Sequence, residues 1–103
     1  MGITKNVKAL DEIMVTLRLN RAELAKHYHV KDIGVFGSYA RSKQRVSSDV
    51  DILVDFSEPV GLFRFLELEE HLHELLGIKV DLVTKGALKP RIGERILKEV
   101  VYL

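Results

Sequence analysis

The sequence predicts an α/β domain of the α+β type, in which helices pack on one face of a small β-sheet. Segments in which apolar and polar residues alternate, typical of strands, recur three times along the chain. Segments with apolar residues three and four positions apart, typical of helices, lie before, between and after them. A length of 103 residues suffices for one core, so we expect residues 1–103 to form a single domain.

The composition argues against several classes of protein. Hydrophobic residues make up 47% of the chain and charged residues 30%, which is typical of a globular protein and not of a disordered one. No cysteine is present, so disulfides and thiolate metal sites are excluded. We expect a cytoplasmic protein, because no apolar run reaches the roughly 18 residues of a membrane span and no signal-peptide pattern opens the chain. The net charge of +1, with scattered basic residues, argues against a nucleic-acid partner.

Two helices and a strand are expected first. Residues 4–18 carry apolar side chains at helical spacing and predict an amphipathic helix. A second helix is expected over residues 21–28, with Asn20 as its N-cap and Glu23 at the capping-box position. Residues 30–36 then form the first strand.

The first strand is followed by a Gly-Ser pair. Gly37 allows the backbone to turn tightly, and Ser38 can begin a short helix that reaches Arg41. The unpaired N–H groups at the start of a helix suit an anion, although most such pairs form only a turn. The polar residues up to Ser48 predict an exposed loop.

The strand expected over residues 50–56 has two chemically different faces. One face is apolar and comprises Val50, Ile52, Val54 and Phe56. On the other face, Asp49 and Asp51 lie roughly 6 to 7 Å apart and repel each other unless a cation lies between them. Mg²⁺ prefers carboxylate and phosphate oxygens, so the pair predicts a metal site. The alternative is a solvent-facing acidic pair, and for Asp55 we expect a strand-end role instead of a ligand.

The second half of the chain alternates between helix and strand. A helix is expected over residues 61–76, with Leu62 and Leu66 in its apolar stripe and Gly77 at its end. Residues 78–84 form a strand with Ile78, Val80 and Leu82 on one face.

The other face of that strand carries a third carboxylate. Asp81 lies opposite the apolar set, as Asp49 and Asp51 do in their own strand, so all three should emerge on the uncovered face of one sheet. A last helix is expected over residues 88–103, with Pro90 in its first turn.

The residues at 37–56, GSYARSKQRVSSDVDILVDF, resemble a family signature: Gly-Ser, ten residues, Asp-x-Asp. It is the signature of the DNA polymerase β-like nucleotidyltransferase superfamily. The C-terminal residues VDLVTKGALKPRIGERILKEVVYL and the short length resemble its minimal nucleotidyltransferase (MNT) branch. The similarity extends from Val30 to Leu103. It implies the polymerase β-like fold, a small mixed sheet with helices packed against it, and Mg²⁺-dependent transfer of a nucleoside monophosphate to a hydroxyl group.

Roles for individual residues follow from this resemblance. Catalytic and metal-binding roles, for two Mg²⁺ ions, fall on three carboxylates: Asp49, Asp51 and Asp81. Asp81 would also help to deprotonate the acceptor. Binding of the nucleotide, ATP, falls on four residues: Gly37, Ser38, Arg41 and Ser48.

Two questions about the loop stay open. Arg41, Lys43 and Arg45 either reach the phosphates or are solvated loop charges. Ser42 stands where relatives commonly have glycine, which is awkward if that position needs a positive φ.

Many MNT proteins are antitoxins of toxin–antitoxin pairs whose toxin is a HEPN-domain ribonuclease. The resemblance therefore implies a protein adenylyltransferase that transfers AMP from ATP to a tyrosine of such a toxin. Two alternatives remain open: masking of the toxin by binding alone, and transfer to a small molecule, for which 103 residues leave little extra room. A toxin or a second copy of the chain would cover exposed apolar surface.

The four histidines raise the possibility of a zinc site. We expect surface or boundary positions instead, because His71 and His73 are two apart on a helix and do not face each other. The other two are His27 and His29.

Overall fold

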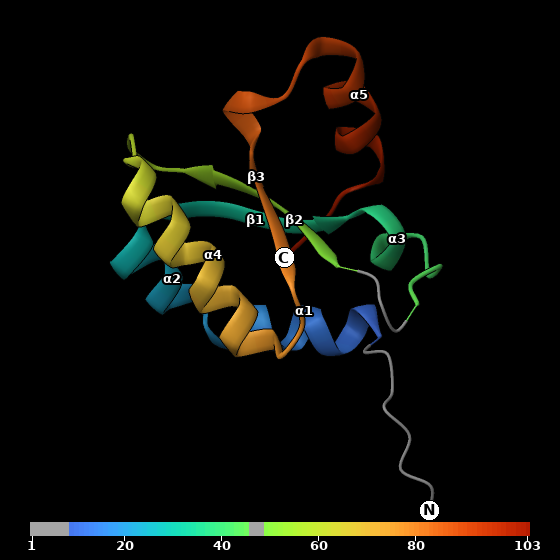
Figure 1. Ribbon diagram of the computed structural model, residues 1–103, viewed down its shortest axis with the longest axis horizontal. Coiled ribbons are helices and arrows are strands. Elements are labelled where there is room, and N and C mark those ends of the chain that lie inside the picture. The colour runs from blue at the N-terminus through green and yellow to red at the C-terminus, as the bar shows by residue number, and fades with distance from the viewer. Residues whose placement is uncertain (1–8, 46–48) are drawn as a thin grey trace, which may run out of the picture.

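The computed structural model describes residues 9–45 and 49–103, so the expectations for residues 4–8 and for Ser48 fall outside it. A four-stranded sheet with the order β3-β2-β1-β4 forms the centre of the molecule (Figure 1). Its strands are β1 (Val30–Phe36), β2 (Val50–Phe56), β3 (Val80–Thr84) and β4 (Val101–Tyr102). β1 runs antiparallel to β2 and β4, whereas β2 and β3 are parallel, so the mixed sheet is confirmed.

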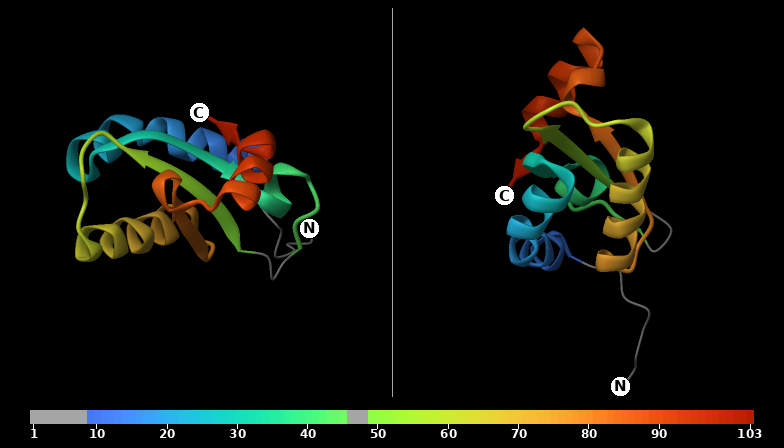
Figure 2. Two further views of the ribbon diagram at one scale, coloured as in Figure 1. Left: turned by 90° about the horizontal axis from the view of Figure 1, so that it is seen from above. Right: turned by 90° about the vertical axis from the view of Figure 1, so that its left-hand side faces the viewer.

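One face of the sheet is covered by three helices. They are α1 (Leu10–Leu19), α2 (Arg21–Tyr28) and α4 (Leu62–Leu76), and all three lie on the same side in Figures 1 and 2. The expected helix-backed sheet is confirmed by this layer. A further helix, α5 (Pro90–Glu99), lies beyond the opposite face (Figure 2).

The core lies between the sheet and the three-helix layer. It follows the alternation expected for β2, because Val50, Ile52 and Val54 are all fully buried. The helices contribute side chains at helical spacing, namely Ile13, Met14, Leu17, Leu24, Leu68, Leu72 and Leu76. Burial of this much apolar surface is the main stabilising term for so small a domain.

The connections between strands follow from their directions. The short helix α3 (Gly37–Ala40) and the loop after it join the antiparallel strands β1 and β2. Parallel strands require a crossover, which α4 supplies between β2 and β3. After β3, the 3-10 helix Lys85–Ala87 leads into α5, whose first turn contains Pro90 as expected.

Two details of the helices differ from expectation. The stripe of α4 is rotated, since Leu62 is 68% exposed and Leu66 is 46% exposed, whereas Leu68 is buried. Asn20 occupies the N-cap position of α2, but its side chain makes no capping bond. Its amide donates to the carbonyl of Thr16 instead, because the preceding helix offers an unpaired acceptor there.

The prediction for the last segment is wrong at its C-terminal end. The helix predicted over residues 88–103 ends at Glu99, and β4 pairs with β1 through Val101 and Tyr102. An edge of β1 is open to backbone hydrogen bonding, and Gly34 admits the incoming chain. A Cβ added to Gly34 would lie 2.8 Å from both the carbonyl oxygen of Val101 and a methyl group of Val100.

Among the described residues, no helix is both long enough and apolar enough to cross a membrane.

Candidate functional site

Asp51 lies at the centre of the predicted acidic site. It is half-buried near the start of β2, and the parallel pairing of β2 with β3 sets it directly beside Asp81. Neighbouring strands are about 4.8 Å apart, so the two side chains leave the sheet from adjacent positions. Asp81 is exposed and lies opposite the buried Val80 and Leu82, as the alternation predicts. Carboxylates that are 30 positions apart in sequence therefore belong to one site.

The pKa of Asp51 shows that the negative charges around it are not balanced by positive ones. Burial, and then repulsion by Asp81 and Asp49, raises the pKa of Asp51 from 3.8 to about 6. Arg41 opposes this shift in the pKa, and Glu99 adds to it. The site therefore disfavours a third negative charge unless a cation is bound nearby.

Gly37 lies directly against this acidic centre. Its φ of +74° is in the left-handed region, and a side chain at this position would collide with the carboxylate of Asp51. Glycine is thus required here on both conformational and steric grounds. Ser38, the next residue, is half-buried in α3.

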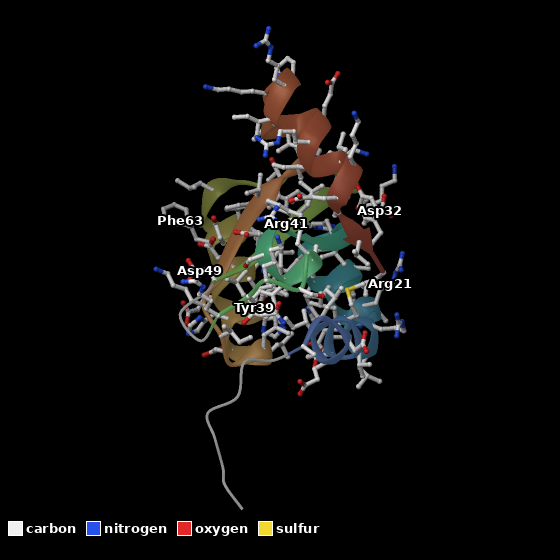
Figure 3. The ribbon with its side chains drawn as sticks, turned by 90° about the vertical axis from the view of Figure 1, so that its right-hand side faces the viewer. Arg21, Asp32, Tyr39, Arg41, Asp49 and Phe63 are labelled. Atoms are coloured by element: carbon white, nitrogen blue, oxygen red, sulfur yellow. The ribbon has the colours of Figure 1, made fainter. Side chains whose placement is uncertain are left out.

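Tyr39 and Asp49 lie on the same side of the molecule as Arg41 (Figure 3). Tyr39 is 1% exposed and belongs to the core, and burial together with the charge of Asp49 raises its pKa. The α3 turn is thus anchored in the core by Tyr39, while Gly37 and Arg41 lie at the acidic site.

Glu99 is part of the site but was not expected from the sequence. The backbone N–H of Gly37 donates to Glu99 Oε2 at 2.9 Å. Arg41 Nη1 donates to Glu99 Oε1 at 2.9 Å and to Oε2 at 3.2 Å. No pattern in the sequence marks this residue, because it is one of several glutamates on polar helix faces and lies 62 positions from Gly37.

The loop after α3 bears on the backbone conformation of Ser42 and on the roles of the three basic residues Arg41, Lys43 and Arg45. Ser42 has a φ of +58°, so this position does need the left-handed conformation that glycine adopts more readily. Lys43 and Arg45 are exposed, whereas Arg41 is held by Glu99 beside the acidic centre. Arg41 therefore belongs to the site through its contact with Glu99 and its charge near Asp51.

The donor set suits Mg²⁺ only in part. Across residues 9–45 and 49–103, no three His, Cys, Asp or Glu side chains are arranged so that they could hold a metal ion by themselves. The hard oxygens and the raised pKa of Asp51 nevertheless fit a divalent cation whose coordination is completed by phosphate oxygens. As expected, the histidines occupy surface or boundary positions, and His71 stacks on Tyr28.

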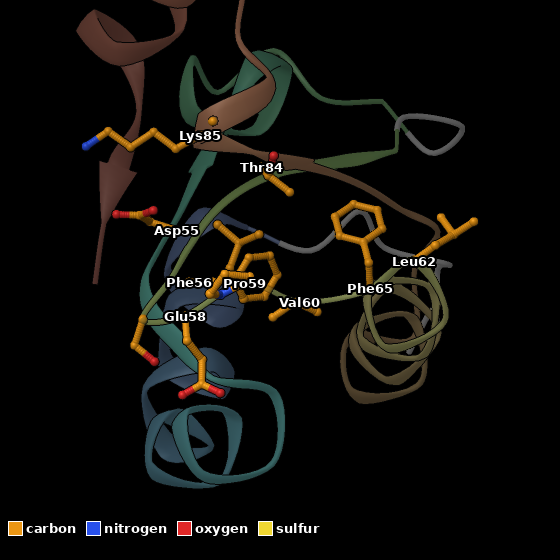
Figure 4. Close-up of a pocket in the computed structure, with 12 residues that line it drawn as sticks. Asp55, Phe56, Glu58, Pro59, Val60, Leu62, Phe65, Thr84 and Lys85 are labelled. Atoms are coloured by element: carbon orange, nitrogen blue, oxygen red, sulfur yellow. The ribbon is translucent and has the colours of Figure 1, made fainter.

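Two pockets near these elements differ in character. The smaller, about 180 Å³, lies between α3 and α5. Its lining comprises Phe36, Gly37, Arg41, Ile92, Arg95, Ile96 and Glu99. The larger, about 650 Å³, lies at the far end of β2 beside the start of α4 and contains Phe56, Pro59 and Phe65 (Figure 4). None of the predicted catalytic or nucleotide-binding residues lines the larger pocket, so its size does not identify the site.

Comparison with known proteins connects this geometry to a family. The family model described as "Nucleotidyltransferase domain" matches residues 17–103. The protein adenylyltransferase MntA of Thermococcus cleftensis is 51% identical over 94 residues, which is 91% of this chain and 95% of that protein.

Solved structures of nucleotidyltransferases have the same fold. A minimal nucleotidyltransferase superposes with a TM-score of 0.81 at 33% identity, covering 93% of this chain and 97% of that chain. A toxin–antitoxin structure with AMP-PNP superposes with a TM-score of 0.67 at 25% identity, covering 89% of this chain and 69% of that chain. A chain from the complex of a tri-AMPylated Shewanella oneidensis HEPN toxin with its MNT antitoxin shares the fold, with a TM-score of 0.63 at 20% identity, covering 87% and 70%.

Proposed function

We propose that this chain, which belongs to the nucleotidyltransferase domain family, is a protein adenylyltransferase and the antitoxin of a HEPN toxin. It transfers AMP from ATP to a tyrosine hydroxyl of that toxin and thereby neutralises it. The 51% identity to a protein adenylyltransferase supports the reaction class, and the likeness to a toxin–antitoxin structure with AMP-PNP supports the nucleotide and the kind of partner.

The observation that carries this proposal is the position of the acidic centre next to Gly37. Asp51 on β2 lies beside Asp81 on β3. Gly37 lies so close to the Asp51 carboxylate that no side chain would fit at its position. A phosphate group bound at the Gly37 amide is therefore next to the carboxylates, as transfer at a phosphorus atom requires.

The reaction needs little covalent chemistry from the protein. The tyrosine oxygen attacks the α-phosphorus in line, the bond from that phosphorus to the bridging oxygen breaks, and pyrophosphate leaves with the bonding electrons. The tyrosine proton passes to a carboxylate, for which we assign Asp81, the exposed member of the set. Gly37, Ser38 and Arg41 hold and orient the triphosphate, and Ser48 remains a predicted fourth contact.

Asp49, Asp51 and Asp81 are the residues that would hold Mg²⁺, and two ions would offset their charge. When bound, Mg²⁺ would supply positive charge to the leaving phosphates and lower the pKa of the acceptor hydroxyl.

The test is AMP transfer by purified protein to its HEPN partner, identified from the neighbouring gene, in the presence of radiolabelled ATP and Mg²⁺. We expect label on one or more toxin tyrosines, and a loss of at least about 100-fold in rate for Asp49→Asn and Asp81→Asn. Asp55→Asn is the matched control, because Asp55 lies on the same strand face beyond the site. Absence of label with every nucleotide and metal tried would refute the enzymatic proposal.

Masking by contact alone is tested separately in cells. The double substitution of Asp49 and Asp51 by alanine is co-expressed with the toxin, and growth is measured. Continued toxicity supports neutralisation by catalysis, whereas full rescue would show that binding is sufficient.

A further inference from the structure

We propose that the Glu99 carboxylate occupies, in the nucleotide-free protein, the position that a phosphate group of the nucleotide takes, so that Glu99 must leave before the nucleotide can bind fully. This inference rests on the proposed nucleotidyltransferase function. It adds a residue that sets nucleotide affinity and that belongs to α5, outside the Gly-Ser and Asp-x-Asp residues.

The contacts of Glu99 are those that an anion makes. One carboxylate oxygen accepts from the Gly37 amide at 2.9 Å and the other accepts from Arg41 at 2.9 Å. We call this pair of donors the anion position. Charge-assisted bonds of this kind are the contacts that proteins also use for phosphate oxygens. A carboxylate already bound there excludes a phosphate oxygen from the same donors.

The negative charge of Glu99 also repels the nucleotide. Glu99 is close enough to Asp51 to contribute to the rise in its pKa, so it adds a further negative charge to a centre that already has three carboxylates. A triphosphate brings more negative charge to the same place. Repulsion between like charges therefore favours release of Glu99 as the nucleotide arrives.

The surroundings leave room for this exchange. The pocket of about 180 Å³ between α3 and α5 is lined by Arg41, Arg95 and Glu99, so a second arginine lines the pocket that holds the anion position. Glu99 is the last residue of α5 and its side chain is 28% exposed. Its carboxylate can thus swing toward solvent by side-chain rotation, without unfolding of the helix.

The affinity of the free protein is reduced by this arrangement. If the anion position is open in about one molecule in ten, the apparent dissociation constant for the nucleotide is raised about tenfold. Removing the charge of Glu99 weakens this competition, because a neutral side-chain carbonyl accepts from the same donors less strongly than a carboxylate. The opposite sign is expected if Glu99 instead stays in place to orient Arg41 for the nucleotide.

The test is isothermal titration of the full chain with Mg²⁺–ATP and, separately, with inorganic tripolyphosphate. We expect Glu99→Gln to bind both about tenfold more tightly than wild type. Glu94→Gln is the matched control, because Glu94 is an exposed glutamate on the same helix and loses the same charge. Equal or weaker binding by Glu99→Gln would overturn the inference, as would equal tightening by Glu94→Gln.

A second measurement uses only wild-type protein and so holds even if Glu99→Gln folds poorly. The side-chain carboxylate ¹³C resonance of Glu99 is followed during titration with tripolyphosphate. Movement toward the value of a free glutamate, in parallel with saturation of the Gly37 amide resonance, supports release. An unmoved carboxylate resonance at saturation overturns it. Wild-type protein that binds neither ATP nor tripolyphosphate would contradict the proposed function itself, whereas normal binding without release contradicts only the role of Glu99.

Discussion

The two faces of β2 have opposite effects on the protein. On the face toward the helices, Val50, Ile52 and Val54 are fully buried and stabilise the fold. On the other face, burial and then the neighbouring carboxylates raise the pKa of Asp51, so its charged form costs stability at neutral pH. One strand thus supplies both the centre of the core and the centre of the site. The fold tolerates repulsion between the carboxylates because the apolar face of the same strand is packed in the core.

Leu53 shows that the division is not complete. It shares a face with Asp51 yet is 1% exposed, and it is paired with Gly34 of β1. Val100 at the end of α5 lies against Gly34, so the C-terminal segment covers this part of the acidic face. Asp51, two positions nearer the start of β2, remains half-exposed on that face.

The largest effect is expected on the buried face. Ile52→Ala removes a side chain that is 0% exposed and leaves a cavity, so we expect a loss of about 3 to 4 kcal/mol in the free energy of unfolding. The measurement is urea denaturation followed by circular dichroism. Asp49→Ala, on the other face, is the control and should not be destabilised. Comparable losses for both variants would break the contrast between the faces.

A smaller effect of opposite sign is expected at the acidic centre. Burial and the neighbouring carboxylates hold the pKa of Asp51 at about 6 in the folded protein, against 3.8 as the ordinary value. The folded state therefore binds the proton more tightly, and the stability that this proton supplies is present below about pH 3.8 and is lost as the pH rises through about 6. Asp51→Asn keeps the neutral form at every pH. Because the side chain is partly solvated, we expect a gain of only about 1 to 2 kcal/mol above pH 6.

The check is the unfolding free energy of wild type and Asp51→Asn between pH 4 and pH 8, without metal or nucleotide. The difference should grow with pH up to about 6 and then level off. Asp81→Asn, at an exposed position, should show a smaller gain. A wild type that is the more stable of the two at pH 8 would show that the charge of Asp51 is compensated.

The smallest effect is expected in the loop between the two strands. Ser42 has a left-handed backbone with a φ of +58°, which glycine adopts without strain. We therefore expect Ser42→Gly to raise the free energy of unfolding by about 0.5 to 1 kcal/mol. Ser57→Gly is the control, since Ser57 is an exposed serine without a positive φ; it should lose about 1 kcal/mol, because its hydroxyl also donates to the carbonyl of His29. Thermal unfolding monitored by calorimetry compares the two, and a loss in both would mean that the φ of Ser42 costs nothing.

Much of the fold could be predicted because it depends on local patterns. The bounds of α2, β1 and β2, and the glycine that ends α4, follow from alternation, helical spacing and capping. The stripe of α4 was predicted less well. Leu62 and Leu66 fit a helical stripe, but which side of a helix is buried depends on the neighbour against which it packs, and periodicity does not specify that neighbour.

Local alternation is enough to predict that Asp49, Asp51 and Asp81 lie opposite apolar side chains, because a strand turns alternate residues to opposite faces whatever surrounds it. Three further features depend on contacts between distant segments: Asp81 lies beside Asp51, β4 pairs with β1, and Glu99 reaches Gly37 and Arg41. These contacts join segments 30 to 68 positions apart. The packing of the whole chain selects them, since the local backbone preferences of each segment allow many other pairings.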